Sequence, residues 1–311
     1  MPALLGLLQL LFVGALATVA VLIIYTAWSL LHPPKRTYAW ALSRGVAGDP
    51  SELDEPLAYE PISIQSNGQT LRGWLIKGHA PSAPRLVLVH GWGSSSIGAL
   101  KRVPRLASVV SEIITLDLPG HGESTGTARM GTSEHLDINT LLSSLDEAKP
   151  TVLYGWSMGA GIAMRAAVEY KEAHDICGVI AESPYIHAIT PARNVIRLRG
   201  LPIALNIEPT IALLGVLRGV GPFWNGFARD KIAASLQVPL LLIHGSDDPV
   251  CPIDDSKQLQ QASKNTELVV IEHAGHNNIW TVPEFSENAG ESIQNFMQAI
   301  DGSQFPSPSQ Q

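Results

Sequence analysis

The chain has 311 residues, of which 45% are hydrophobic and 16% are charged, and its net charge is −7. The charged share is below the roughly 25% usual for soluble domains, so part of the chain is expected to contact lipid or to be deeply buried. An acidic balance without a long basic run gives no support to a nucleic-acid partner. Cys177 and Cys251 have no metal-ligand spacing and imply no disulfide framework.

An apolar run from Ala3 to Leu31 carries no charged side chain. About 20 helical residues span the ~30 Å core of a bilayer, so the run predicts a single-pass membrane anchor within residues 1–34. A cleaved signal peptide is the main alternative, with ALATVA as its cleavage site. However, no basic residue precedes the run, which exceeds the roughly 7–15 apolar residues of a signal. A buried core helix is a further alternative, which the apolarity on all sides disfavours.

Charge and composition predict how the rest of the chain is organised. Lys35, Arg36 and Arg44 follow the run. Positive residues favour the cytoplasmic side, which predicts a globular part that faces the cytoplasm. Residues 35–56 are predicted to be a tether, and residues 57–301 a single globular domain. Residues 302–311 are rich in Ser, Gln and Pro and are predicted to be disordered.

The globular part alternates between predicted strands and helices. Residues 59–65 and 70–76 flank Asn67-Gly68, a dipeptide typical of hairpin turns. Continuous apolar runs, typical of parallel strands covered on both faces, follow at 85–90, 113–118, 151–155, 177–183, 239–245 and 267–273. Helical stretches lie at 97–108, 133–147, 158–174, 256–263 and 284–300. This order predicts an α/β fold with a mostly parallel central sheet and helices on both faces.

One connection, between the runs at 177–183 and 239–245, is much longer than the roughly 2–6 residues of an ordinary loop. Residues 186–236 are therefore predicted to form a helical cap insertion over the carboxyl edge of the sheet. Their apolarity leaves two alternatives, which are ordinary core helices followed by a loop and a second surface that touches the membrane.

A nucleophile motif occupies the junction between a predicted strand and a predicted helix. Gly155-Trp156-Ser157-Met158-Gly159 matches G-x-S-x-G in the structural context that this motif requires. A sharp turn there exposes the serine, and side chains two positions to either side would collide, which explains both glycines. The serine needs a general base to become nucleophilic.

The candidate base and acid lie in loops after the last two predicted strands. His276 is expected to fold back over the serine, whereas His273, at the end of the strand, is the alternative base. Asp248 is favoured as the carboxylate that orients the imidazole, with Asp247 as the alternative. The resulting order of serine, aspartate and histidine is the chain order of α/β-hydrolases.

Five segments resemble the α/β-hydrolase superfamily, close to its serine-esterase (esterase or lipase) and its BEM46-like or prolyl-peptidase-like branches. They are VLVHGWGSS, LDLPGHGEST, GWSMGA, HGSDDPV and HAGHN, and the resemblance covers residues 57–301. It implies an oxyanion hole made by the backbone N–H groups of Trp92, which follows His-Gly, and Met158, which follows the serine. Trp92, Trp156 and Trp280, together with the apolar cap, suggest an apolar substrate pocket.

The sequence thus predicts a membrane-anchored serine hydrolase that uses Ser157, Asp248 and His276 on an ester or thioester of an apolar, lipid-like acyl substrate. A serine peptidase or an acyltransferase of the same fold, and a non-catalytic binding protein, are the alternatives. The chain has no H-E-x-x-H motif, P-loop or dinucleotide fingerprint in context, so neither a metal nor an organic cofactor is predicted.

Overall fold

The computed structural model describes residues 1–145, 149–198 and 206–301. The predicted disordered tail, 302–311, lies outside the described residues, as does part of the predicted cap. In chain order the elements are α1 (Pro2–Leu31), α2 (Tyr38–Arg44), η1 (Pro50–Glu52), β1 (Tyr59–Ser66), β2 (Gln69–Lys77), β3 (Arg85–Val89), α3 (Ser96–Ala99), α4 (Val103–Leu106), η2 (Ala107–Val109), β4 (Glu112–Leu116), α5 (His135–Ser143), β5 (Thr151–Trp156), α6 (Met158–Tyr170), β6 (Ile176–Glu182), α7 (Ile189–Leu198), α8 (Ile207–Leu217), η3 (Asn225–Phe227), α9 (Arg229–Ala234), β7 (Leu240–Gly245), α10 (Ile253–Ala262), β8 (Thr266–Ile271) and α11 (Pro283–Asp301).

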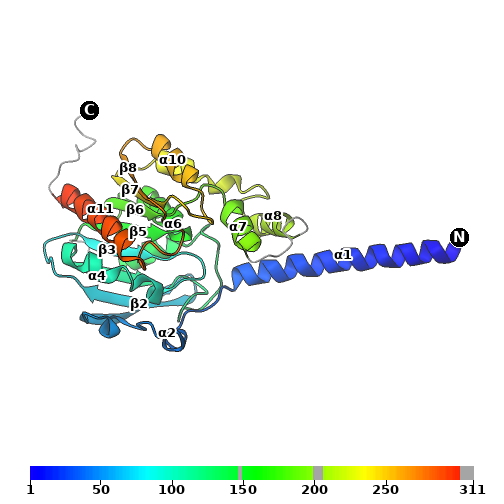
Figure 1. Cartoon of the computed structure of the whole chain (residues 1–311), viewed down its shortest axis with the longest axis horizontal. Coiled ribbons are helices and arrows are strands. Elements are labelled where there is room, and N and C mark those ends of the chain that lie inside the picture. Colours follow the sequence, from blue (N-terminus) through cyan, green and yellow to red (C-terminus); the bar gives the residue numbers. More distant parts are fainter. Residues whose placement is uncertain (146–148, 199–205, 302–311) are drawn as a thin grey trace.

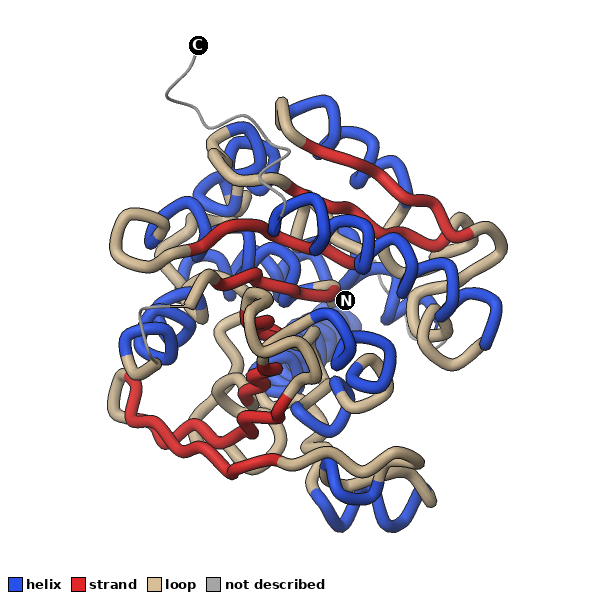
Figure 2. Tube along the Cα trace, turned by 90° about the vertical axis from the view of Figure 1, so that its left-hand side faces the viewer, coloured by secondary structure: helices blue, strands red, loops and turns tan. Residues whose placement is uncertain are grey.

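Within the described residues, eight strands form one sheet in the order β1-β2-β4-β3-β5-β6-β7-β8. The predicted hairpin is formed by β1 and β2, and β2 also pairs antiparallel with β4. All pairs from β4 across to β8 are parallel. The predicted fold class is therefore confirmed, with a mostly parallel sheet and helices on both of its faces (Figure 2).

The central strand β5 shows why these strands have continuous apolar sequences. Successive side chains of a strand point to opposite faces of the sheet. Leu153 packs in the apolar core that contains residues of α5 and α6, whereas Val152 and Tyr154 pack in the core that contains residues of α4 and α11. Because both faces are covered, every residue of β5 is buried, and alternation with polar residues would leave polar groups inside a core.

Helix α1 extends away from the domain as one long rod (Figure 1). Among the described residues it is the one helix that is long and apolar enough to cross a membrane. Its last turns contact the domain, because Thr26 and Ala27 are buried there and Asn206 Nδ2 donates a hydrogen bond to Thr26 Oγ1 over 2.7 Å. Helix α8 packs beside this end of α1.

The segment predicted as a cap contains α7, α8, η3 and α9 in its described part. In Figure 1 it lies next to the end of α1 that contacts the domain. The segment predicted as a tether, residues 35–56, contains α2 and η1.

The order of the strands marks where a ligand site is expected. The chain places β4 on one side of β3 and then returns to place β5 on the other side. Ligands of open α/β sheets bind outside the carboxyl ends of the strands at such a reversal. Trp92 lies just after β3, and Ser157 directly follows β5, so this edge of the sheet carries two of the predicted site residues.

Candidate active site

Ser157 occupies a sharp turn between β5 and α6. Its backbone angles are φ 55° and ψ −117°, a conformation that is strained for any residue with a side chain. A Cβ atom on Gly155 would lie 2.0 Å from the carbonyl oxygen of Gly159, and one on Gly159 would lie 2.0 Å from the carbonyl oxygen of Val89. Gly155 is therefore required for the turn to close onto the start of α6, and Gly159 is required for α6 to pack against β3.

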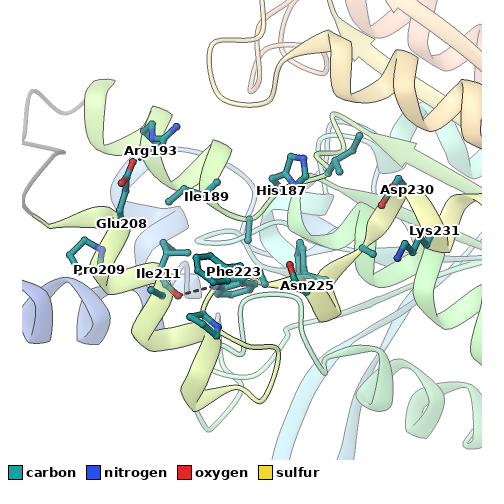
Figure 3. A pocket seen from close by; sticks show the side chains of 17 residues that line it. His187, Ile189, Arg193, Glu208, Pro209, Ile211, Phe223, Asn225, Asp230 and Lys231 are labelled. Atoms are coloured by element: carbon teal, nitrogen blue, oxygen red, sulfur yellow. Dashed lines mark hydrogen bonds and ion pairs between the residues drawn. The ribbon is translucent and has the colours of Figure 1, made fainter.

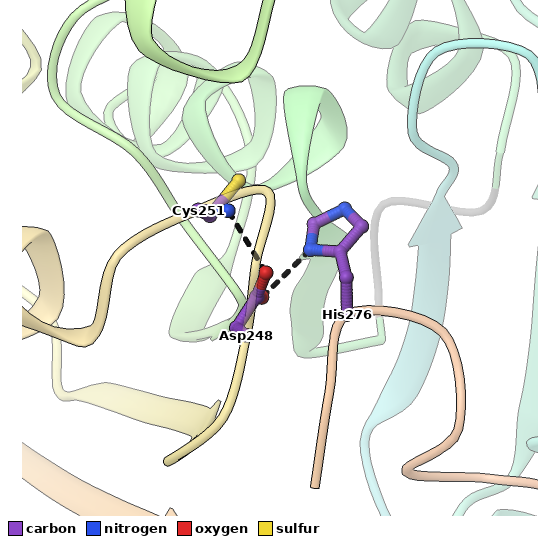
Figure 4. Close-up of side chains that lie close together, drawn as sticks. All are labelled: Asp248, Cys251 and His276. Carbon is purple, nitrogen blue, oxygen red and sulfur yellow. Dashed lines mark hydrogen bonds and ion pairs between the residues drawn. The ribbon is translucent and has the colours of Figure 1, made fainter. Parts of the chain in front are cut away.

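The structure brings Ser157, His276 and Asp248 into one hydrogen-bonded chain. His276 Nε2 lies 3.2 Å from Ser157 Oγ. On the other side of the ring, His276 Nδ1 lies 2.7 Å from Asp248 Oδ2, the contact that Figure 4 shows. The alternative residues lie elsewhere, since the side chains of Asp247 and His273 are 63% and 84% exposed and approach each other at 3.6 Å. The three connected residues come from the loops that follow β5, β7 and β8.

The Asp248 carboxylate is buried among hydrogen-bond donors. Its Oδ1 atom accepts bonds of 2.8 Å from the backbone N–H groups of both Val250 and Cys251, and His244 Nε2 lies 3.5 Å from Oδ2. Burial alone would raise the pKa of this carboxyl, but the imidazoles of His244 and His276 outweigh burial and hold the pKa well below its ordinary value. Asp248 therefore stays ionised near neutral pH and accepts a hydrogen bond from the Nδ1–H of His276. With the proton on Nδ1, Nε2 can accept the hydrogen bond of the Ser157 hydroxyl.

The loop after β3 lies against the serine turn on its other side. A Cβ atom on Gly91 would lie 3.1 Å from Ser157 Cβ. The next residue, Trp92, has a backbone N–H without a hydrogen-bond acceptor among the described residues. The N–H of Met158 belongs to the first turn of α6, where N–H groups have no acceptor within the helix and carry partial positive charge. Both predicted oxyanion donors thus lie in segments next to Ser157.

The indoles of Trp156 and Trp280 are placed differently from the expected substrate surface. Both are buried, and they flank the guanidinium of Arg102 at 3.9 and 5.7 Å from their ring centroids. Arg102 pairs with the buried Glu182 over 2.6 Å, and Trp280 Nε1 donates to the same carboxylate over 2.8 Å. Glu182 in turn accepts the backbone N–H of Ser157 on its carbonyl oxygen over 2.8 Å. Protein groups thus account for the packing of both indoles, and the backbone of Glu182 links this cluster to the serine turn.

A cavity of about 910 Å³ opens within the cap segment, between α7, α8 and α9 (Figure 3). Ser157 and His276 are not among its lining residues. Its walls combine apolar side chains with a charged rim that includes the ion pair between Arg193 and Glu208. The lining residues are Ile186, His187, Ala188, Ile189, Arg193, Glu208, Pro209, Ile211, Ala212, Pro222, Phe223, Trp224, Asn225, Phe227, Ala228, Asp230 and Lys231.

Arg229, a residue that the sequence did not single out, connects this cavity with the serine turn. Its guanidinium packs on the rings of Tyr185 and Phe227 at 3.9 and 4.3 Å, and Phe227 lines the cavity. The same guanidinium donates to the carbonyl oxygen of Met158 over 3.4 Å. An arginine in a short helix gives no sequence signal of this role, because Tyr185 and Met158 lie 44 and 71 residues away in sequence.

Asp248, Cys251 and His276 also offer three possible metal-ligand atoms within 4.8 Å of one another (Figure 4). A thiolate is the ligand form of cysteine, but burial raises the pKa of the Cys251 thiol well above its ordinary value. The carboxylate and imidazole already hydrogen bond to each other. The donor set therefore fits an aspartate–histidine pair beside a neutral thiol better than it fits a metal centre.

Part of the chain, which includes the candidate site, is similar to known proteins. Residues 86–288 match the model of the Alpha/beta hydrolase family. The chain belongs to this family. An esterase from Pyrococcus furiosus has the same fold, with a TM-score of 0.65 and 24% identity over 86% of this chain and 97% of the esterase.

The curated relatives of this alpha/beta hydrolase align with it over a smaller share of their own length. The acetyltransferase component of the acetoin cleaving system of Pseudomonas putida is 27% identical over 72% of this chain and 66% of the relative. Lysophosphatidylserine lipase ABHD12 of Rattus norvegicus is 26% identical over 60% of this chain and 47% of the relative. The chain spans 50% to 66% of the length of three of the curated relatives that it matches.

Proposed function

We propose that this alpha/beta hydrolase is a membrane-anchored serine hydrolase that cleaves the ester or thioester bond of an apolar acyl substrate. The observation that carries the proposal is the continuous hydrogen-bond chain from Ser157 through His276 to the buried carboxylate of Asp248. An acyl transfer needs a nucleophile, a base within hydrogen-bond reach and a group that orients the base, and these three side chains supply them.

The reaction follows from this arrangement. Ser157 Oγ attacks the acyl carbon while His276 Nε2 takes the hydroxyl proton. The N–H groups of Trp92 and Met158 stabilise the oxyanion, and Asp248 stabilises the imidazolium. The tetrahedral intermediate collapses as His276 gives its proton to the leaving alcohol or thiol. A water molecule, deprotonated by His276, then attacks the acyl-enzyme and releases the acid, and the proton returns to Ser157.

An apolar acyl substrate is supported by the cavity of the cap segment, which Arg229 connects with the serine turn. The cap cavity has walls of Ile189, Ile211, Phe223 and Phe227. Such concave apolar walls favour ligands with hydrocarbon or aromatic parts. A lipase among the relatives and an esterase with the same fold agree with this substrate class.

Membrane association is supported by two adjacent apolar surfaces. One is the charge-free helix α1, and the other is the exposed side of the cap next to it. Exposed apolar side chains favour an apolar partner, and a lipid surface fits side chains on a segment that packs beside an apolar helix. We place the domain on the cytoplasmic side, on the basis of Lys35, Arg36 and Arg44 after α1. The exposed cap residues are Leu213 (39%), Val216 (57%), Leu217 (67%) and Phe223 (84%).

Labelling with a fluorophosphonate probe in membranes washed with alkaline carbonate tests the nucleophile and the anchor together. The wild-type chain is expected in the pellet, labelled by the probe. Ser157→Ala is expected in the same pellet without label, and with ester hydrolysis lowered by about 10⁴-fold or more. Protease protection of the same vesicles checks the side on which the domain lies.

Ser183→Ala is the matched control. Ser183 directly follows β6, the strand next to β5. It is buried and has a positive φ of 45°, but its Oγ atom has no hydrogen-bond partner among the described residues. This variant is expected to keep its label. Undiminished labelling of Ser157→Ala would refute the proposed nucleophile. Turnover of peptide amides, or turnover only with an added alcohol acceptor, would instead identify a peptidase or an acyltransferase that uses the same residues.

A further inference from the structure

The carboxyl end of α1 contacts the loop that carries the proposed oxyanion donor. The last carbonyl groups of a helix accept no hydrogen bond from the helix itself, so they need donors from elsewhere. Here Trp92 Nε1 donates to the carbonyl oxygen of Leu30 over 2.9 Å, and the backbone N–H of Ala128 donates to that of Leu31 over 3.0 Å. Partial negative charge at a helix C-terminus strengthens such bonds. The catalytic domain thus caps the proposed anchor.

The residues that follow α1 contact the same loop and the segment that follows β4. Ser95 Oγ donates to the carbonyl oxygen of Arg36 over 3.0 Å, and Lys35 Nζ donates to that of Ser124 over 2.9 Å. A Cβ atom on Gly93 would lie 3.9 Å from Pro34 Cδ. The loop from 91 to 96 is therefore enclosed between the serine turn on one side and the segment 30–36 on the other.

Trp92 joins these two sides within a single residue. Its backbone N–H belongs to the proposed oxyanion hole, while its partly buried indole is tied to α1. An oxyanion donor is effective only within roughly 2.7–3.1 Å of the position that the oxyanion will occupy. A fixed indole restricts the backbone of its own residue, because only two side-chain torsions separate the ring from the Cα atom.

We propose that the indole N–H of Trp92 is a positioning group, which uses the carboxyl end of α1 as the fixed point that holds the oxyanion loop in place. The inference rests on the proposed function, since it concerns the same site. It assigns α1 a role in catalysis in addition to its role as an anchor. Loss of the bond between Trp92 and Leu30 is expected to weaken transition-state stabilisation and to leave substrate binding unchanged.

The test uses the full chain in phospholipid nanodiscs. Trp92→Phe removes the N–H, and replacement of Trp92 by benzothienylalanine removes it while the ring keeps its size. For a p-nitrophenyl ester, kcat is expected to fall by about 10- to 100-fold and KM to stay within about twofold. The affinity of a boronic acid that mimics the tetrahedral intermediate is expected to fall by the same factor as kcat/KM, and the pH profile of kcat is expected to stay unchanged.

Trp74→Phe is the matched control, because Trp74 is a partly buried indole on β2, with β4 between it and β3. It is expected to keep the wild-type kcat. A kcat within twofold of wild type in the benzothienylalanine variant would overturn the inference. So would an increase in KM alone, which would make the indole a substrate contact. If either result is found while Ser157→Ala abolishes hydrolysis in the same assay, only the role of the indole fails and the proposed function stands. A wild-type enzyme that does not hydrolyse the ester would overturn both the inference and the proposed function.

Discussion

The two sides of the candidate active site are built in different ways. On the nucleophile side, Ser157, Asp248 and His276 each lie within a few residues of the end of a strand, and local turns present them. On the oxyanion side, the loop of Trp92 is held by the end of α1 and by the segment that follows β4. The first side depends on short motifs and the second on contacts between segments far apart in sequence. The comparison separates what a motif specifies from what only the fold supplies.

The two sides also differ in charge. The nucleophile side contains a carboxylate whose pKa is held low, whereas the oxyanion side contains the buried carboxylate of Asp117, whose pKa burial raises to about 6, and two neutral histidines whose rings lie 4.8 Å apart. His90 Nδ1 donates to the carbonyl oxygen of Gly91, so its Nε2 accepts the backbone N–H of Leu118 over 2.9 Å. Burial, followed by the neighbouring His121, lowers the pKa of His90 well below its ordinary value. Substitutions and changes of pH should therefore affect the two sides differently.

The largest effect after loss of the nucleophile is expected from Asp248→Asn, which perturbs the nucleophile side alone. An amide in place of the carboxylate presents an N–H or a weaker acceptor to His276 and favours the wrong tautomer. We expect kcat to fall by about 10⁴-fold, or about 5 kcal/mol in activation free energy, with KM nearly unchanged. Steady-state hydrolysis of a p-nitrophenyl ester measures this.

Asp247→Asn is the control for this substitution. Asp247 is adjacent in sequence but 63% exposed and directed toward His273, so its variant should keep activity within about twofold. Equal losses in both variants would show that the loop as a whole matters, and the role of Asp248 in orienting His276 would have to be abandoned.

A smaller effect is expected from Gly159→Ala, which acts where the two sides meet. The new methyl group would lie 2.0 Å from the carbonyl oxygen of Val89 and 2.8 Å from that of His90, so it would push α6 away from the start of the oxyanion loop. Because these neighbours are backbone atoms, we expect a loss of about 3 kcal/mol or more in unfolding free energy. Urea unfolding followed by tryptophan fluorescence measures this loss.

Gly290→Ala is the matched control in a helix without crowding. In α11 the added Cβ would have no neighbour closer than 3.6 Å, so the variant should be as stable as wild type or more stable by up to about 1 kcal/mol. If Gly159→Ala were equally well tolerated, the close packing of α6 on β3 would not be what holds the serine turn.

The proposed residues of the nucleophile side could be selected from the sequence for a physical reason. Residues that directly follow buried parallel strands must emerge at the same edge of the sheet, so recognising the strands is enough to bring Ser157, Asp248 and His276 near one another. The choice of Asp248 over Asp247 also has a local signal, because Pro249 follows it in the turn. The hydrogen bonds of the structure agree with that choice.

The supporting residues had no comparable signal. Arg102 lies in a stretch that we expected to be one helix over 97–108, but α3 ends at Ala99 and α4 begins with Pro104 in its first turn. The break directs Arg102 inward to Glu182, 80 residues away in sequence. Similarly, apolarity on all sides of α1 hides the fact that its last turns pack on the domain. Contacts at such separations follow from tertiary packing, which periodicity does not encode.

The smallest predicted effect concerns acid and the oxyanion side. Burial lowers the pKa of His121 from 6.5 to about 4, and Lys35 and Arg36 act in the same direction. Between these two values the unfolded chain binds a proton that the folded chain does not, so stability is lost as the pH falls below about 6.5. At pH 5.5 the loss from this one residue amounts to about 1.4 kcal/mol relative to pH 7.5. His90, which is equally buried and neutral, adds a loss of the same sign.

His121→Asn isolates the contribution of His121. The Asn amide can replace His121 Nδ1 as the donor to the carbonyl oxygen of Pro119 but takes up no proton in this range. The variant is expected to be less stable than wild type at pH 7.5, because the Asn side chain is smaller than the buried imidazole that it replaces. It should then lose about 1.4 kcal/mol less than wild type on acidification to pH 5.5, as measured by urea unfolding at both pH values. Ester hydrolysis at pH 7.5 should change less than for Asp248→Asn, because His121 supports the loop and does not touch the reacting atoms. If the unfolding free energies of the variant and of wild type changed equally with pH, the pKa of His121 would be the same in the folded and the unfolded chain. His121 would then be protonated at pH 5.5 in the folded chain, and the proposed contrast between the two sides would fail.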